Sequence, residues 1–354
     1  MTAVRRRIHT SRKFAAPALA GAALLAGCGG TAADQGSGAP SGADDATRAA
    51  SVSIENCGAR VTLPQAPQRI VSLNQGSTEI LLSLGVADRM VGTATWTDPV
   101  LPALADANAE VERLAENNPS LEVVLQKEPD LVTASFHNTL AEGGVADRAT
   151  FGKLGVPTYM SPSECVKANN DDGDGARSTP LEMSTISQEV TELGRLLSVP
   201  GEAERVNASL NTRLDAAAAT PAKDGTSVVY WFANSEQPYV AGGYGAPGII
   251  SRTLKLTNVY SESTQEWPQV GWEDFAAKNP DVIVLGDLTR KSQTAETAAA
   301  KIAFLEKNPV TRQMDAVRNK RYITVSGGDL NPSLRTVDGV EKVAAGLKKL
   351  GLGG

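Results

Sequence analysis

The chain has 354 residues, a length that corresponds to about two domains. Its 34 Lys and Arg residues face 40 Asp and Glu residues, and this net charge of −6 argues against a nucleic-acid-binding protein. Three Cys and two His are too few for a Cys/His zinc cluster, so we expect no metal site. Hydrophobic residues make up 41% of the chain, which is enough for a large core.

The N-terminal segment is typical of an export signal. A cationic stretch precedes an apolar run, Phe14 to Ala26, which is too short to span a bilayer but fits the central region of a signal peptide. The run ends in Leu25-Ala26-Gly27-Cys28, which resembles the lipobox of bacterial lipoproteins. That resemblance implies removal of residues 1–27 and a lipid on Cys28; the alternative is an ordinary signal peptide with a chance Cys. Residues 28–50 contain no large apolar side chain after Cys28 and predict a flexible tether.

Two further cysteines, Cys57 and Cys165, lie in the predicted folded part. An exported protein with one such pair is expected to bridge it, because disulfides persist outside the cytoplasm. Two free, buried thiols are the alternative.

Residues 51–179 predict an N-terminal α/β lobe. Four short apolar runs read as strands, and turns and helical patterns separate them, as in the turn 74–77 followed by a helix over 78–84. Strands separated by helices indicate βαβ units and a mainly parallel sheet. The predicted strands are 69–73, 90–92, 130–134 and 157–160.

A helical pattern begins at Pro180, with apolar residues at steps of three and four, and a second pattern extends it after Pro200. Residues 180–220 are therefore predicted to form an inter-lobe helix region. Strands over 228–232, 282–285 and 322–325 and helices over 249–256, 272–277 and 337–350 predict a C-terminal α/β lobe over 221–354. The expected fold is α/β, with two lobes of mainly parallel central sheets joined by one long helix; the ligand cleft between the lobes is implied by the family resemblance given below.

An internal repeat supports two lobes. Leu121 to Val132 and Trp272 to Ile283 share Glu, Lys, Pro and Asp at the same spacings. Each predicts a short helix that ends at Pro-Asp and leads into a strand. Glu122 and Glu273 occupy matching positions in the first helical turn, where they favour the helix dipole. Two exposed carboxylates at matched positions could also meet two basic sites on a symmetric partner.

These segments together resemble the helical-backbone class of ABC-transporter substrate-binding proteins, the ferric-siderophore, heme and cobalamin group. The resemblance covers about Arg60 to Leu350, and it implies two lobes that sandwich a small-molecule metal chelate. It also implies that Glu122 and Glu273 dock on the permease dimer of an ABC importer. Trp267 stands in a Trp-Pro-Gln-Val segment that resembles the cleft segment of cobalamin-binding relatives.

Ligands of open α/β sheets bind beyond the carboxyl ends of the strands. Aromatic rings there could give flat walls for a chelate, and arginines could meet its oxygens. His137 as a lone metal ligand is the weaker reading. Phe232 could equally belong to the core. The predicted ligand-binding residues are Asn74, Gln75, Trp96, Phe136, His137, Tyr244, Trp267, Arg290, Asn331 and Arg335.

The sequence thus predicts a monomeric, lipid-anchored, extracytoplasmic protein that captures a ferric siderophore for an ABC importer, with no cofactor and no catalytic residue. Cobalamin or heme is the alternative ligand. A surface hydrolase is the alternative class, but the sequence has no Gly-x-Ser-x-Gly elbow, and its one His after the signal has no obvious nucleophile partner.

Overall fold

The computed structural model describes residues 51–169 and 175–354, which belong to one compact unit. The predicted signal peptide, Cys28 and the tether over 28–50 lie outside the described residues. None of the helices in the described part is long and apolar enough to cross a membrane.

The first lobe is built on a five-stranded sheet with the order β5-β4-β3-β6-β7, in which every neighbouring pair is parallel. All four predicted strands are present, and β5 was not predicted. A hairpin of β1 and β2 precedes the sheet. The strands are β1 (Val52–Asn56), β2 (Ala59–Leu63), β3 (Ile70–Ser72), β4 (Met90–Ala94), β5 (Arg113–Ala115), β6 (Leu131–Ala134) and β7 (Thr158–Met160). The helices are α1 (Gln75–Ser83), α2 (Ala105–Ala109), α3 (Leu121–Leu125), α4 (Arg148–Lys153) and α5 (Pro162–Cys165).

The second lobe has a sheet with the order β11-β10-β13-β14, and β12 also pairs with β10. Only β11 is antiparallel to its neighbour, so both sheets are mainly parallel, as predicted. The strands are β10 (Ser227–Ala233), β11 (Tyr239–Val240), β12 (Thr257–Asn258), β13 (Val282–Asp287) and β14 (Tyr322–Ser326). The helices are α8 (Ala246–Thr253), α9 (Trp272–Lys278), α10 (Ala298–Lys307), α11 (Asp315–Arg318) and α12 (Arg335–Lys349).

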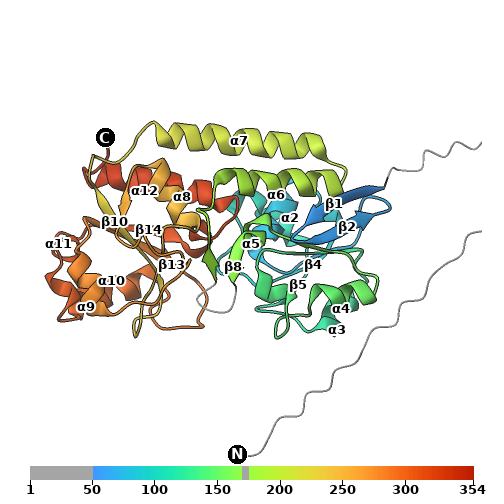
Figure 1. Cartoon of the computed structure of the whole chain (residues 1–354), viewed down its shortest axis with the longest axis horizontal. Helices are drawn as coiled ribbons and strands as arrows, with labels where there is room; N and C mark the ends of the chain where they lie inside the picture. Colours follow the sequence, from blue (N-terminus) through green and yellow to red (C-terminus); the bar gives the residue numbers. More distant parts are fainter. Residues whose placement is uncertain (1–50, 170–174) are drawn as a thin grey trace, which may run out of the picture. The chain divides into compact units, whose positions relative to one another are not determined.

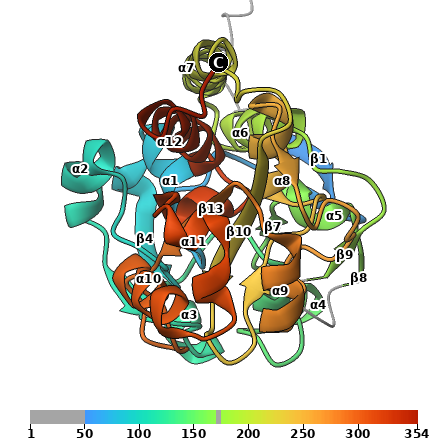
Figure 2. The same cartoon turned by 90° about the vertical axis from the view of Figure 1, so that its left-hand side faces the viewer.

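A helical hairpin joins the lobes. The pattern predicted from Pro180 divides into α6 (Met183–Leu196) and α7 (Pro200–Ala218), because Ser198 adopts a left-handed conformation (φ 59°) and Pro200 starts a new helix. Gly194 allows the two helices to approach, since a Cβ there would lie 2.4 Å from that of Ala203. Helix α7 is the long inter-lobe helix, and Figures 1 and 2 show it running outside α6 and α12.

Helices cover both faces of each sheet, because successive strand residues point to opposite sides. In the second lobe, Val228 and Tyr230 pack with α8 and α12, whereas Val229 and Trp231 pack with α9, α10 and α11. The largest core begins in the first lobe and continues into the second through Ile249, Leu334 and Val337. This core is therefore shared by the two lobes, beside further cores that lie within one lobe.

The repeated segments take the same form in both lobes. Glu128 and Asn279, the residues before the prolines, are both left-handed, with φ of 47° and 38°. The aspartate after each proline then accepts a backbone N–H from the start of the neighbouring strand: Arg69 to Asp130 (2.8 Å) and Ser227 to Asp281 (2.8 Å). Each Pro-Asp thus ends a helix and ties the next strand to its neighbour.

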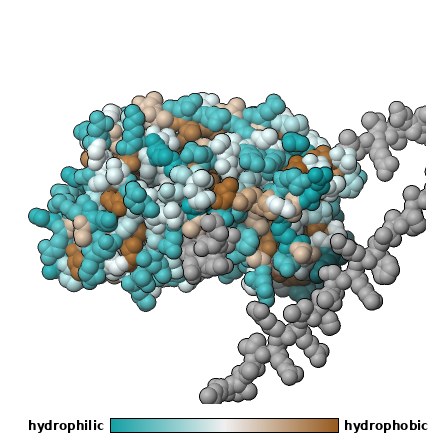
Figure 3. All heavy atoms as spheres, in the orientation of Figure 1, coloured by the Kyte–Doolittle hydropathy of each residue, from teal (hydrophilic) through white to brown (hydrophobic). Residues whose placement is uncertain are grey.

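Two smaller predictions have clear outcomes. Helix α1 begins at Gln75, three residues earlier than predicted, and Ser77 N–H donates to Ser135 Oγ in the neighbouring loop. Cys57 and Cys165 form the expected disulfide, which joins the end of β1 to α5. The molecular face in Figure 3 is mainly hydrophilic, with small separate hydrophobic spots.

Candidate functional site

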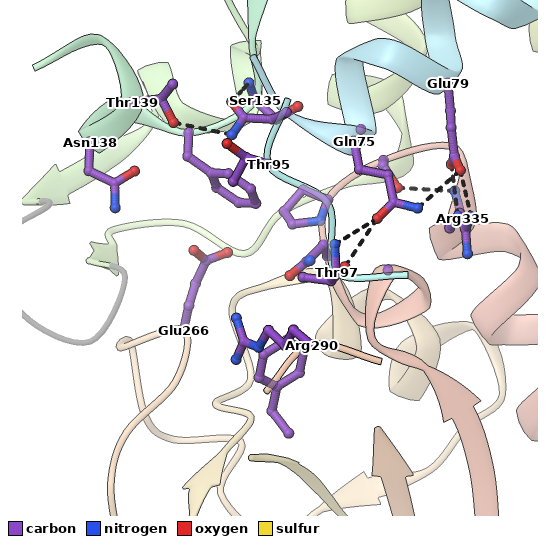
Figure 4. Close-up of a pocket in the computed structure, with 18 of the residues that line it drawn as sticks. Gln75, Glu79, Thr95, Thr97, Ser135, Asn138, Thr139, Glu266, Arg290 and Arg335 are labelled. Atoms are coloured by element: carbon purple, nitrogen blue, oxygen red, sulfur yellow. Dashed lines mark hydrogen bonds and ion pairs between the residues drawn. The ribbon is translucent and has the colours of Figure 1, made fainter. Parts of the chain in front are cut away.

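A cavity of about 240 Å³ lies between the two lobes, at the carboxyl ends of their strands (Figure 4). Residues from both lobes line it, including most of those predicted from the sequence. The predicted residues that the structure brings together there are Asn74, Gln75, Phe136, Trp267, Arg290, Asn331 and Arg335.

Aromatic rings form two sides of the cavity. Phe136 follows β6 in the first lobe and is half-buried. Phe232 in β10 packs against Trp267, with ring centroids 4.8 Å apart, and the Arg290 guanidinium lies 5.2 Å from the Phe232 centroid. A backbone bond from Val240 N–H to Pro268 O (3.1 Å) holds the Trp267 segment against the sheet. Phe232, which could equally have belonged to the core, lines the cavity, whereas its neighbour Trp231 is fully buried.

The side-chain amide oxygens of Asn74 and Gln75 accept hydrogen bonds from backbone groups of the protein. Asn74 Oδ1 accepts the N–H of Ser135 (2.8 Å), and Gln75 Oε1 accepts the N–H of Thr97 (3.0 Å). These bonds hold the loops after β6 and β4 against the start of α1. Asn74 and Gln75 therefore shape the cavity wall.

A buried ion pair closes one end of the cavity. Arg335, at the start of α12, donates two hydrogen bonds to Glu79 in α1, at 2.8 and 2.5 Å. Both side chains are buried, and Figure 4 shows them pointing toward each other across the lobes. Burial alone would lower the pKa of Arg335, but Glu79 outweighs it and raises that pKa. We call Glu79 and Arg335 the α1–α12 pair.

Asp98 adds a second inter-lobe bond beside this pair. Its carboxylate accepts the N–H of Gly328 (2.6 Å), which lies in the turn after β14. Burial raises the pKa of Asp98. A Cβ on Gly328 would lie 2.9 Å from Arg335 Cδ, so only glycine leaves room for this approach.

Four buried charges form a second bridge at another part of the cavity. Glu266, directly before Trp267, accepts from Arg177 (2.7 Å) and Lys167 (2.7 Å), and Lys167 also contacts Glu164 (2.7 Å). Burial raises the pKa of Glu164; it would lower that of Lys167, but the two carboxylates outweigh it and raise it. We call Glu164, Lys167, Arg177 and Glu266 the four-charge cluster.

Three predicted residues lie outside the cavity. Trp96 lines a neighbouring pocket, and its ring is covered by Arg113 at 4.9 Å. His137 is exposed and lines a pocket beside the disulfide, and Tyr244 is half-buried away from the cavity. Each follows a strand or turn near the sheet ends, but its loop leads the side chain away.

Sequence reasoning missed the charged bridges. Glu79 directly precedes the apolar run Ile80-Leu81-Leu82 of α1, and a carboxylate beside such a run was the available sign of a buried partner. Glu266 directly precedes the Trp-Pro-Gln-Val segment, and no feature of that segment predicted its ion pairs. Within residues 51–169 and 175–354, no group of three or more His, Cys, Asp or Glu side chains could hold a metal ion.

Comparisons with known proteins agree with this architecture. The periplasmic binding protein family matches residues 70–327. The vitamin B12-binding protein of Vibrio cholerae is 24% identical over 288 residues, 80% of this chain and 91% of the relative. The uncharacterized ABC transporter substrate-binding lipoprotein YvrC of Bacillus subtilis is 25% identical over 337 residues, 92% of this chain and 93% of the relative.

The fold is also that of solved structures. A periplasmic binding protein from Veillonella parvula superposes with a TM-score of 0.71 at 24% identity, over 84% of this chain and 97% of that one. The two lobes and their parallel sheets therefore agree with the predicted fold. The chain belongs to the periplasmic binding protein family, and it is a solute-binding protein of the ABC-importer type, not an enzyme.

Proposed function

We propose that this protein captures a ferric siderophore outside the cytoplasm and delivers it to the permease of an ABC importer. The observation that carries the proposal is the inter-lobe cavity, with Phe136 on one lobe and Phe232 and Trp267 on the other. Flat aromatic walls from both lobes suit a compact, partly apolar chelate. The cavity is slightly smaller than the roughly 300–1,000 Å³ of typical ligand pockets, so a chelate would protrude or separate the lobes slightly.

Cobalamin is the second candidate, because a relative at 24% identity is named a vitamin B12-binding protein and Trp267 stands in the segment that resembles such proteins. Heme is less favoured by the site. No His, Cys, Met or Tyr is among the described residues that line the cavity, so none of them offers an axial ligand to iron there.

Docking on the permease is proposed for Glu122 and Glu273. Both side chains are exposed in the first turns of α3 and α9. Figures 1 and 2 show these helices on the side of the lobes away from α7. A hydrogen bond from its own backbone lowers the pKa of Glu122. Lipid on Cys28 would hold the protein at the membrane.

Ligand capture is tested by titrating the protein with ferric hydroxamates, ferric catecholates, heme and cyanocobalamin while following tryptophan fluorescence. Saturable quenching by a ferric hydroxamate supports the proposal, and quenching by cyanocobalamin alone supports the second candidate. Trp267→Phe should lose most of the quenching, whereas Trp96→Phe, outside the cavity, should keep it. Trp267→Ala should weaken binding by about 1–3 kcal/mol. An unfolded variant is excluded by its far-UV circular dichroism.

Docking is tested by uptake of the labelled chelate in cells. Glu122→Arg with Glu273→Arg should abolish uptake and leave the Kd unchanged. The matched control, Glu110→Arg with Glu262→Arg, makes the same charge change at one exposed site per lobe and should retain uptake. A large loss of affinity in the first double variant would contradict the docking role.

A further inference from the structure

The charges of the cavity wall indicate the charge of the ligand. Four charged side chains line the cavity, and each has an opposite charge beside it. Two belong to the α1–α12 pair, and Glu266 belongs to the four-charge cluster. The fourth, Arg290, contacts Glu296 at 3.3 Å, and Glu296 is itself buried. The described wall therefore presents no cation without a carboxylate partner.

Groups directly behind the wall do not change this balance. With Asp98 included, the pairs and the cluster hold four cations and five carboxylates. The basic residues Arg113 and Lys291 line the neighbouring pocket with Trp96 and do not line the cavity. An anion in the cavity would thus have to compete with the carboxylate that already neutralises each arginine, and opening the buried α1–α12 pair is costly.

The groups left for a ligand are uncharged. The side chains of Asn138, on the first lobe, and Asn331, on the second, line the cavity and make no hydrogen bond to another described residue. An amide offers both donors and an acceptor without net charge. Together with Phe136, Phe232 and Trp267, these amides suit a ligand with apolar and amide-like surfaces.

We propose that the cavity selects chelates without net negative charge, in which the chelating groups neutralise the metal, and disfavours polyanionic chelates. Ferric tris-hydroxamates and cyanocobalamin meet this condition. Ferric tris-catecholates and dicarboxylate tetrapyrroles do not. This inference rests on the proposed function and narrows its substrate class.

The test uses three forms of one ferric tris-hydroxamate that differ only at a remote amine. Ferrioxamine B is a cation, its N-acetyl derivative is neutral and its N-succinyl derivative is an anion. Kd values come from isothermal titration calorimetry at low and moderate salt. We expect similar Kd values for the first two forms and about tenfold weaker binding of the anion, a penalty that added salt reduces. Cyanocobalamin and its monocarboxylic acid form a second matched pair.

A substitution at Glu296 should reduce the preference against the anionic form if the inference is correct. Glu296→Gln keeps an oxygen to accept the N–H of Gln293 but leaves Arg290 without a counter-charge. The anionic form should then bind about 3–10-fold more tightly than to the wild type, while the neutral form is unchanged. Glu204→Gln, on the exposed side of α7, makes the same charge change away from the cavity and should alter neither.

Each outcome separates the two proposals. Equal or tighter binding of the anionic forms, or binding of ferric catecholate or heme alone, overturns the charge inference and leaves chelate capture standing. Absence of binding by every chelate overturns both. Similar binding of the cationic and neutral forms, weaker binding of the anionic form and a smaller penalty for the anion in Glu296→Gln support both.

Discussion

Two charged bridges connect the lobes at the cavity, and they are built differently. The α1–α12 pair is one cation and one carboxylate between two helices, and Leu334 and Val337 beside Arg335 belong to the shared core. The four-charge cluster has two cations and two carboxylates, and Cys165 of the disulfide lies between its members Glu164 and Lys167 in the chain. Removing one charge of the α1–α12 pair leaves the other member without an opposite charge. Removing one cation of the four-charge cluster leaves a second cation beside the carboxylates. The number of partners, more than burial, should therefore decide how much each bridge tolerates.

The largest loss of stability is expected when one member of the α1–α12 pair is removed. Arg335→Met leaves Glu79 buried without a counter-charge and should cost about 3–5 kcal/mol of unfolding free energy. Urea unfolding followed by circular dichroism measures the loss. Adding Glu79→Leu to Arg335→Met removes the unpaired charge and should recover most of it. A single variant with less than about 1 kcal/mol of loss would mean that the pair is solvated.

The Cys57–Cys165 disulfide lies beside the four-charge cluster and not beside the α1–α12 pair. It closes a sequence separation of 108 residues, so Cys57→Ala with Cys165→Ala should cost about 2–4 kcal/mol. Reductant should bring the wild type to the same midpoint in urea and leave the variant unmoved. If reductant also destabilises the variant, the loss does not come from this bond.

Glu189 in α6 gives this side of the molecule a pH dependence. Burial raises its pKa from about 4.5 to about 8, and Glu164 and Glu192 add to the effect, whereas a hydrogen bond from Ser161 opposes it. The folded state therefore keeps a proton that the unfolded state has lost, so stability falls as pH rises between these values. Glu189→Gln cannot ionise. From pH 5 to 7 the wild type should lose roughly 2–3 kcal/mol relative to this variant.

That prediction is checked by unfolding both proteins in urea at pH 5, 6, 7 and 8. The difference between them should grow with pH. A constant difference would show that Glu189 is already ionised when folded.

The smallest loss is expected inside the four-charge cluster. Lys167→Met removes one cation, but Arg177 still neutralises Glu266, so the cost should be about 1–3 kcal/mol. Urea unfolding of Lys167→Met and Arg335→Met under the same conditions shows whether a cluster tolerates the loss of one cation better than a pair does. A loss as large as that of Arg335→Met would mean that Arg177 does not compensate.

The sheets could be predicted because their strands are buried on both faces and read as short β-branched runs, as in Val282–Asp287. Helix α10 was missed because its buried side is Ala298, Lys301 and Leu305, which shows little apolar periodicity. The Lys301 ammonium instead donates to the carbonyls of Gly286 and Glu296. A buried helix face that contains Ala and Lys cannot be recognised from the apolar periodicity of a single sequence.

The cavity could be predicted in part for a similar reason. Strand ends locate loops, so Asn74, Phe136 and Asn331 were found, but strand ends do not give the direction in which a loop turns, as His137 shows. Arg335 was expected to meet a ligand, and it is held by Glu79, 256 positions away. Nothing local in the chain marks two residues so far apart as partners.

The core that continues from the first lobe into α8 and α12 has a consequence for heating the protein. If each lobe had a closed core of its own, calorimetry would resolve two heat-absorption peaks. Because Ile249, Leu334 and Val337 complete the core of the other lobe, neither lobe can melt and leave its neighbour intact. We expect a single peak, with a calorimetric enthalpy equal to the van't Hoff enthalpy.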